Sequence, residues 1–582
     1  MNTNFHRGGR GHNSHSLMRM LLFLVFIGIG FIYVVNIYVL TQYHQTSTYM
    51  NNDDQSNFIL QFQNDSISSN GNSLKDNTID SNRMMNVIQI ENQLSGSPEW
   101  ILSSPALNRE VEGYMSKSSI NKGQSIKLFY SVNEPNLPTD AMVSIEVFRS
   151  GWYQGIGGRK LLGPINVPPI AQEMPSFERD GLLACKWKDP FILNTESSWT
   201  SGVYLVKMTL KPAQVQSYAI FVVRDDDRKE KADIMLQLPF NTYQAYNIWG
   251  GKNIYRCNLS KRCEQARMAS FDRPYAAPDN KAGAFGTGAG EYLSNVQPFE
   301  TYPIKTTASW NYNMVRWMEK NGLDVTYVAN ADVHSRLPRL MKPRVFMTQG
   351  HDEYWSWAMR DHVMAWRDEG VHLAFLGSNT AYWQIRYEDS DGESSLETDN
   401  TNTESRTMVC YRREKKDPIK TQYRTTKWRL VRPEALLVGV EYLFPLGDPF
   451  DEDMLVSNYE HWMFKNTGVK KGDALPGLLG YEVDRIQKES LVPKEGNLDE
   501  PVKNIVELFA TPLINRKNNK ITSHGAIYQA SSGAYVFSPG TMQWSWGLDD
   551  YGVEQGLRTS RLNSVVETMT WNFLEAAGIK RR

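Results

Sequence analysis

The sequence has few cysteines and no excess of basic residues. Four cysteines in 582 residues are too few to build a fold from disulfides. Lysine and arginine number 63 against 64 aspartates and glutamates, a net charge of -1. Proteins that bind nucleic-acid phosphates normally carry a basic surplus. The chain also lacks a G-x-S-x-G elbow, a Walker A loop, an H-E-x-x-H helix and a pair of C-x-x-C motifs. We therefore expect neither a disulfide-built scaffold nor a nucleic-acid partner.

Apolar and aromatic residues are plentiful. Hydrophobic residues make up 41% of the chain and aromatic residues 12%. This composition is globular and excludes disorder throughout. The length allows about three to five domains. We predict a cytosolic tail at 1–19, a transmembrane signal anchor at 20–40, a disordered stem at 41–98, a β-sandwich at 99–228, and an α/β domain at 229–582 with an acidic surface insertion at 388–406.

The N-terminal region contains one long apolar run. Residues 20–40 read MLLFLVFIGIGFIYVVNIYVL, and at about 1.5 Å per residue they span about 30 Å, one bilayer core. Arg7, Arg10 and Arg19 precede the run, and the next charge is Asp53. The positive-inside rule then places the N-terminus in the cytosol and the body in a lumen or outside the cell. A cleaved signal peptide is the alternative, but its apolar region is usually about 7–15 residues long. The pattern predicts a single-pass type II membrane protein whose residues 20–40 contact the lipid bilayer.

Two sequons and one pair of cysteines fit such a compartment. Asn64 and Asn258 each begin an N-x-S sequon, which predicts a glycoprotein. Cys257 and Cys263 flank the second sequon, and in an oxidising lumen they can close a small disulfide loop. Free thiols are the alternative. Without a nearby histidine or further cysteine, the pair is a poor zinc signature.

Two segments differ in their periodicity. Between 99 and 228, short runs with period-2 character are separated by Gly, Pro, Asn and Ser, which predicts an antiparallel sandwich. After Lys231, apolar strands alternate with amphipathic helices, which predicts a parallel sheet. The expected strands are 125–131, 141–148, 202–210 and 217–223 in the first segment, and 233–238, 325–328, 345–348 and 371–376 in the second; the expected helices begin at Asn313 and Ser356 and end before Asn321-Gly322 and at Gly370.

Polar side chains follow one of these strands. His351, Asp352, Glu353 and Tyr354 come directly after the strand at 345–348. In open parallel sheets, ligands bind beyond the carboxyl ends of the strands. An imidazole, two carboxylates and a phenol supply acid–base groups or hard metal ligands. The alternative is helix capping, because acidic residues favour the positive end of a helix dipole.

Aromatic side chains follow the neighbouring strands. Tyr243, Tyr246 and Trp249 come after the strand at 233–238, and Asn379 and Trp383 come after the strand at 371–376. At the same edge of the sheet they would line a cleft around the polar cluster. A packed surface loop is the alternative for the first three. Ser378, at a strand-to-turn junction, is a further candidate nucleophile.

Several blocks of sequence occur in the order of a known family. The chain resembles the C-terminal domain family of the N,N-dimethylformamidase large (beta) subunit over about residues 99–582. The resemblance implies a β-sandwich followed by a domain of the glutamine-amidotransferase (flavodoxin-like) class. With the patterns above, we expect an α/β plus all-β protein: an N-terminal antiparallel β-sandwich, then a flavodoxin-like parallel-sheet domain, tethered by one transmembrane helix. The blocks are FVVRDD (221–226), LPFNTYQAYNIWGG (238–251), MVRWMEKNGLDVTYV (314–328), GHDEYWSWAMRD (350–361), LGSNTAYWQIRYE (376–388) and GTMQWSWGLDD (540–550).

The resemblance also implies a cofactor. Family enzymes that hydrolyse dimethylformamide hold a mononuclear iron with two tyrosines and a glutamate, and such a metal polarises the amide carbonyl and supplies hydroxide. Tyr354 matches one ligand tyrosine, and Tyr312 is the candidate for the second, although Asn313 lies nearer the expected spacing. The stretch 421–429, where the glutamate is expected before Trp-Arg, has no carboxylate.

Two functions remain open on this sequence. The first is a membrane-anchored hydrolase-like protein that cleaves a non-peptide C–N bond in a small amide-containing substrate. The second is a non-catalytic lumenal or cell-surface module that binds a glycan or a peptide. Thiol chemistry at Cys410 is a weaker third, because no partner histidine is evident.

Overall fold

The computed structural model describes residues 85–581, except 279–280, 296–307, 389–404, 413–414, 447–450, 498 and 515–517. The predicted tail and anchor, most of the stem, the sequon at Asn64 and most of the acidic insertion lie outside these residues. Met84–Arg582 form one compact unit. In the described part of the chain, no helix is both long enough and apolar enough to cross a membrane.

The N-terminal part is a sandwich of two sheets. The expected strands form, and Val143, Ile145 and Val147 alternate along one of them into the core between the sheets. Neighbouring strands are antiparallel, except that β2 runs parallel to β8. The first sheet has the order β1 (Val111–Met115), β3 (Ser125–Val132) and β6 (Phe191–Asn194); the second has the order β2 (Ser119–Asn121), β8 (Val215–Arg224), β7 (Gly202–Lys211), β4 (Met142–Ser150) and β5 (Gly158–Val167).

A seven-stranded sheet forms the centre of the second part. Its first five strands are parallel, whereas β22 and β21 are antiparallel to their neighbours. The order is β11 (Val325–Ala329), β9 (Ile234–Leu238), β12 (Val345–Gly350), β14 (His372–Gly377), β23 (Tyr535–Ser538), β22 (Lys520–Gln529) and β21 (Val506–Ile514).

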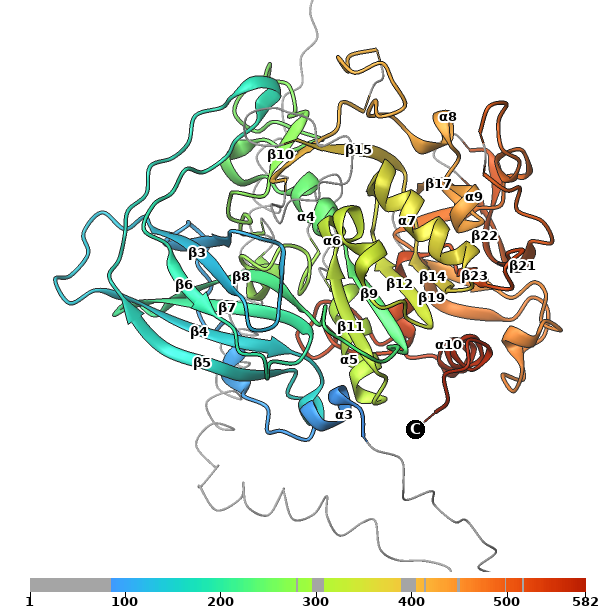
Figure 1. The fold of residues 1–582 in the computed structure, drawn as a ribbon, viewed down its shortest axis with the longest axis horizontal. Helices are drawn as coiled ribbons and strands as arrows, with labels where there is room; N and C mark the ends of the chain where they lie inside the picture. Colours follow the sequence, from blue (N-terminus) through green and yellow to red (C-terminus); the bar gives the residue numbers. More distant parts are fainter. Residues whose placement is uncertain are drawn as a thin grey trace, which may run out of the picture. The chain divides into compact units, whose positions relative to one another are not determined.

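Both faces of this sheet are buried by helices. Along β12, Phe346 packs on one face and Met347 on the other, since successive strand residues point in opposite directions. Helices α6 (Asn330–Ser335) and α7 (Trp357–Asp368) cover the first face (Figure 1). The second face packs against α5 (Asn311–Lys320) and α10 (Ser564–Ala576).

Three of the four predicted helix ends are confirmed, whereas the first helix begins at Asn311 rather than Asn313. The Ser356 hydroxyl accepts the Met359 N–H and begins α7, and Gly370 follows its end with φ +91°. Helix α5 ends before Asn321, and Gly322 then has φ +62°. Such left-handed positions favour glycine.

The remaining elements are short. They comprise α3 (Val87–Glu91), α4 (Phe240–Tyr246), α8 (Trp428–Val431) and α9 (Ala435–Val438); a four-stranded sheet of β10 (Met268–Ser270), β16 (Thr407–Val409), β15 (Trp383–Glu388) and β13 (Tyr354–Ser356); the pairs β17 (Glu441–Pro445) with β20 (Glu482–Arg485) and β18 (Asp451–Leu455) with β19 (Ala474–Gly480); and the 3-10 turns η1 (Pro98–Trp100), η2 (Tyr153–Gly155), η3 (Arg179–Gly181), η4 (Trp249–Gly251), η5 (Lys281–Gly286), η7 (Leu337–Arg339), η8 (Trp462–Phe464), η9 (Lys488–Leu491) and η10 (Met542–Gly547).

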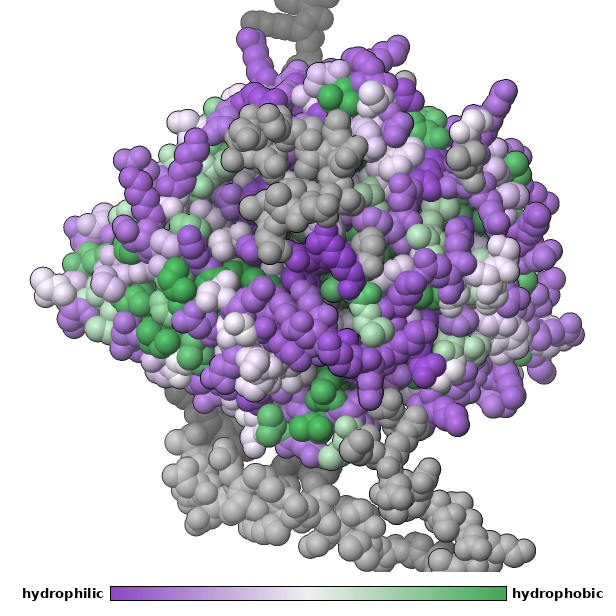
Figure 2. All heavy atoms as spheres, in the orientation of Figure 1, coloured by the Kyte–Doolittle hydropathy of each residue, from purple (hydrophilic) through white to green (hydrophobic). Residues whose placement is uncertain are grey.

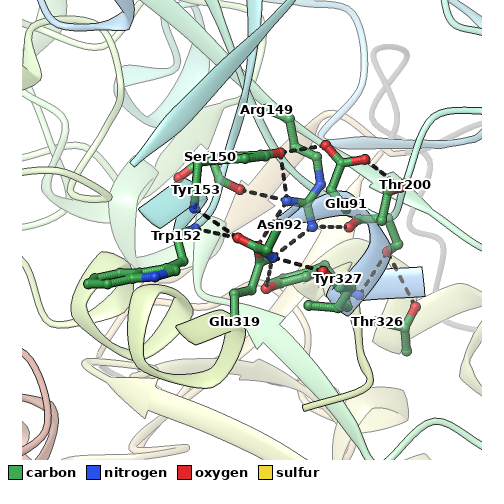
Figure 3. A network of polar contacts seen from close by, with 12 residues as sticks. Glu91, Asn92, Arg149, Ser150, Trp152, Tyr153, Thr200, Glu319, Thr326 and Tyr327 are labelled. Carbon is green, nitrogen blue, oxygen red and sulfur yellow. Dashed lines mark hydrogen bonds and ion pairs between the residues drawn. The ribbon is translucent and has the colours of Figure 1, made fainter. Parts of the chain in front are cut away.

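A buried ionic network joins the sandwich to the second part (Figure 3). Arg149 on β4 binds Glu319 on α5 at 2.7 Å, and neither side chain is exposed to solvent. Tyr153 donates to Glu91 at 2.6 Å, and Asn92, just after α3, donates to Glu319 at 3.0 Å. Because a buried charge is costly without a partner, these contacts fix the two parts against each other.

The expected fold class is wrong in two respects. The second part contains a mixed sheet, because β22 and β21 add antiparallel strands to its edge. The sandwich is not purely antiparallel, because β2 pairs parallel with β8. The predicted transmembrane tether at 20–40 lies outside the described residues, so membrane location stays a prediction. On the face drawn in Figure 2 most of the described surface is hydrophilic, with apolar patches over the sandwich strands.

Candidate functional site

Two strand ends converge beside each other. Strands β12 and β14 pair in parallel and finish together at Gly350 and Gly377. A Cβ on Gly377 would lie 2.1 Å from the Gly350 carbonyl oxygen, so this close approach requires glycine. The chain then continues into β13 and β15, which pair with Tyr354 opposite Trp383. The segments after the two strands therefore face the same space, as their position at the sheet edge predicts.

An imidazole lies between two carboxylates at this edge. His351 Nε2 is 3.2 Å from Glu353 Oε2 and 3.1 Å from Glu482 Oε2. All three side chains are buried. Burial lowers the pKa of His351, but Glu482 and Glu353 outweigh it and raise that pKa to about 9. At neutral pH the imidazole is therefore protonated and donates to the carboxylates.

Phenols hold the Glu353 carboxylate. Tyr246 and Tyr255 donate to the two oxygens of Glu353 at 3.0 and 2.8 Å, and Tyr354 donates to the Tyr255 hydroxyl at 2.5 Å. Burial raises the pKa of all three phenols, so they remain protonated donors. Burial also raises the pKa of Glu353, although His351 lowers it. A carboxylate with a raised pKa is suited to accept a proton near neutral pH.

A third carboxylate supports the turn after β14. Asp484 accepts the Ser378 hydroxyl at 2.6 Å and the Asn379 N–H at 2.9 Å. Asn379 has φ +56°, a left-handed conformation that asparagine tolerates. Its amide donates to Glu482 at 2.8 Å and lies 3.3 Å from His351 Nε2. Ser378 is thereby engaged as a donor to Asp484. Burial raises the pKa of Asp484 to about 7 despite these hydrogen bonds.

An aromatic and cationic rim borders the cluster. Trp383 donates its indole N–H to the Tyr255 hydroxyl at 3.3 Å. The Arg412 guanidinium lies 4.3 Å from the Tyr255 ring centroid, and Lys427 Nζ lies 4.9 Å from that of Tyr382. These are cation–π distances. A polar centre with aromatic walls and cations is thus assembled at one place.

The sequence-predicted residues divide into two groups. His351, Glu353, Tyr354, Tyr246, Asn379 and Trp383 lie together in the contacts described above. Asp352 is turned away and accepts from Gln237 and Asn330, and burial raises its pKa to about 7. Tyr243 donates to Asn311, and Trp249 donates to Glu112 in the sandwich. Asp352, Tyr243 and Trp249 therefore act in packing rather than at this centre.

The two candidate metal tyrosines are not brought together. Tyr312 donates to the Gly157 carbonyl at 2.9 Å and packs against Trp100 and Tyr292. None of these contacts is shared with Tyr354. In the described residues no group of three or more His, Cys, Asp or Glu side chains is arranged to hold a metal ion. Lys427 occupies the position before Trp428 where a carboxylate was expected. These residues do not fit the implied iron site, so no step below passes through a metal.

Several residues of the site were missed. Among them, Glu482, Tyr255 and Arg412 contact predicted residues but belong to no motif. The only local signal was a lone glutamate that interrupts the apolar stretch 478–483.

The cysteines have separate environments. Cys257 and Cys263 form a disulfide with their Cα atoms 5.8 Å apart, and Asn258 beside them is exposed. Cys185 and Cys410 are buried free thiols. Burial raises the pKa of Cys410 to about 12, which opposes formation of a nucleophilic thiolate.

Comparison with known proteins gives one strong result. The model of the family described as "N,N-dimethylformamidase beta subunit-like, C-terminal" matches residues 144–557. No curated protein is significantly similar. One superoxide reductase (neelaredoxin) structure from Ignicoccus hospitalis is 13% identical over 20% of this chain and 86% of that chain, with a TM-score of 0.13. Another superoxide reductase (neelaredoxin) structure from the same organism is 13% identical over 22% of this chain and 96% of that chain, with a TM-score of 0.14. These TM-scores are too low to support any conclusion.

Proposed function

The chain belongs to the N,N-dimethylformamidase beta subunit-like family over residues 144–557, and we propose that its hydrolase-like domain cleaves a non-peptide amide C–N bond. The observation that carries this proposal is the placement of His351 Nε2 within 3.2 Å of Glu353 and 3.1 Å of Glu482. A proton donor and a proton acceptor lie side by side, buried and bordered by aromatic rings. Amide hydrolysis needs both groups.

The chemistry assigns a different task to each group. Glu353 accepts a proton from water as the water oxygen bonds to the amide carbon. The C–N bond then breaks, and the His351 imidazolium gives its proton to the departing nitrogen. The products are a carboxylic acid and an amine, so atoms and charge balance. Glu482 is a positioning residue, because it keeps His351 protonated.

Phenols complete the centre. Tyr246 and Tyr255 orient Glu353, and Tyr354 reaches it through Tyr255. A phenol held as a donor in a buried site can also stabilise a developing oxyanion. We assign that role to Tyr354, whose hydroxyl proton would turn from Tyr255 to the oxyanion.

A non-catalytic binding function is the second candidate. The observation in its favour is that His351, Glu353 and Glu482 already satisfy one another in this structure. Such a cluster also serves as a rigid floor for a bound ligand.

Amine release distinguishes these functions. The full chain is incubated with a panel of formamides and acetamides, and the amine product is quantified. We expect turnover in the wild type and a loss of about 100-fold or more in Glu353→Gln, in the range that proton-transfer catalysis contributes. Tyr354→Phe should also lose activity while unfolding within a few degrees of the wild type. The matched control is Tyr411→Phe, since Tyr411 donates to Asp180 away from the centre. Retained turnover in Glu353→Gln would refute the mechanism.

A further inference from the structure

A separate cavity lies at the amino ends of the central strands, near the starts of β14 and β23. Its volume is about 590 Å³, and Trp462, Tyr535 and His461 are among the side chains that line it. Tyr535 begins β23 and packs on His372, which begins β14. The candidate site follows the other end of β14, and six residues at about 3.3 Å each separate the two by about 20 Å. The cavity is therefore distinct from that site, and its volume is ordinary for a small-molecule pocket.

Aromatic rings form a continuous wall in this cavity. The centroids of Trp462 and Tyr535 are 5.1 Å apart with their planes inclined by 55°, and His461 lies 5.2 Å from Trp462. All three side chains are only partly buried. Because the rings are inclined and only partly buried, the aromatic surface that they expose suits a ligand that is not flat. A planar ligand would fit better between parallel rings.

Hydrogen-bond donors border the same rings. The Nδ1 atom of His461 accepts the Met463 N–H at 3.3 Å, and burial lowers the pKa of His461. The ring is therefore neutral at pH 7, and its proton sits on Nε2. Trp462 is also partly buried, and no described residue accepts its indole N–H. Both donors remain available to oxygen atoms of a ligand.

The charged side chains around the cavity do not favour binding of an anion or a cation. Arg367 lines the cavity, but it is paired with Asp368 at 2.7 Å and donates to the Leu436 carbonyl at 3.0 Å. Glu500 and Lys503 supply one charge of each sign at the exposed border. The cavity thus offers no net charge to an anion or a cation. It fits a neutral ligand with hydroxyl groups and a puckered apolar face.

We propose that this cavity binds a neutral saccharide. The C–H face of a pyranose ring packs on Trp462 and Tyr535, as apolar groups do on aromatic faces, while its hydroxyls accept from His461 and Trp462. The volume accommodates a disaccharide. This proposal does not depend on the proposed hydrolysis, because it concerns other residues, which lie at the amino ends of the strands.

Saturation-transfer NMR on the full chain tests the proposal. The probes are cellobiose, lactose and N,N'-diacetylchitobiose, with the acyclic polyol sorbitol as the negative probe. We expect saturable transfer to the ring protons of at least one disaccharide at concentrations of about 1–10 mM, as is usual for weak binding. Trp462→Leu should weaken that binding about 10-fold, because the aromatic face is lost while apolar volume remains. Trp357→Leu is the control, since Trp357 is partly buried on α7 against Trp428.

Three outcomes would overturn the proposal. The first is no transfer to any of the three disaccharides up to about 50 mM, beyond useful affinity. The second is equal binding by the wild type and Trp462→Leu. The third is equal transfer to sorbitol, which would show binding of polyols in general. If Trp462→Leu does not fold, as judged by its thermal unfolding, His461→Ala at the border of the cavity replaces it and should also weaken binding.

Discussion

Replacing Glu482 with glutamine removes one of the two carboxylates that face His351. In the wild type, burial lowers the pKa of His351 and the two glutamates raise it from 6.5 to about 9. Without Glu482, burial opposes Glu353 alone, so the pKa of His351 should fall clearly below its wild-type value. The side chains are otherwise similar in shape, and the Asn379 amide can still donate to the glutamine oxygen. The substitution therefore changes charge more than packing.

The same change alters how stability depends on pH. A histidine whose pKa is higher in the folded state stabilises the fold at a pH below 6.5. That contribution is lost as the pH rises through about 9. The full shift corresponds to about 3 kcal/mol of unfolding free energy. The wild type should lose stability between these two pH values, and Glu482→Gln should lose clearly less.

Two measurements check this prediction. The imidazole Cε1–H signals of the ten histidines are followed by NMR from pH 5 to 10, with His351 assigned by its absence in His351→Gln. Urea unfolding at pH 6.5 and at pH 9 then gives the free energies. Glu441→Gln is the control, because Glu441 is buried but pairs with Arg485 instead. A wild-type pKa of His351 at or below 6.5, or the same pKa in Glu482→Gln, would show that Glu482 does not raise the pKa of His351.

Three further predictions concern the fold that holds the site. Glu319→Gln removes the carboxylate that binds the buried Arg149 guanidinium, and urea unfolding should show a loss of about 3–5 kcal/mol; a loss below about 1 kcal/mol would contradict a network that joins the two parts. Gly377→Ala places a Cβ 2.1 Å from a backbone oxygen of β12, so the chain should unfold at lower temperature and lose amine release together; unchanged calorimetry would show that the close approach relaxes freely. Replacing both Cys257 and Cys263 with serine should cost about 2 kcal/mol, the value for closing so short a loop, and an unaltered unfolding midpoint in guanidinium would argue against that value.

Local patterns predicted local structure well. Helix α7 carries its start and stop in its own sequence, because Ser356 caps one end and Gly370 follows the other. The strands β9, β12 and β14 were visible as short apolar runs. The antiparallel pairing of β22 with β23 could not be predicted from the sequence, because it depends on pairing between segments and not on the periodicity of either one.

Only part of the site could be predicted from the sequence, because its residues come from segments that lie far apart along the chain. His351, Glu353 and Tyr354 are adjacent in sequence and follow a strand, so their position at the sheet edge could be predicted. Glu482 reaches His351 from a strand more than a hundred residues later, and no spacing rule indicates it. Tyr312 was expected near Tyr354, but its position on α5 turns it toward the sandwich at Gly157.

The pH profile of amine release by the wild type and by His351→Gln shows whether His351 is the proton donor. The amide that gives the fastest turnover is assayed from pH 6 to 10. We expect wild-type activity to fall as the pH rises through about 9, because the proton that His351 donates is lost there. We expect His351→Gln to remain folded but to lack this activity at every pH. Turnover in His351→Gln equal to that of the wild type, with the same pH profile, would contradict this role of His351.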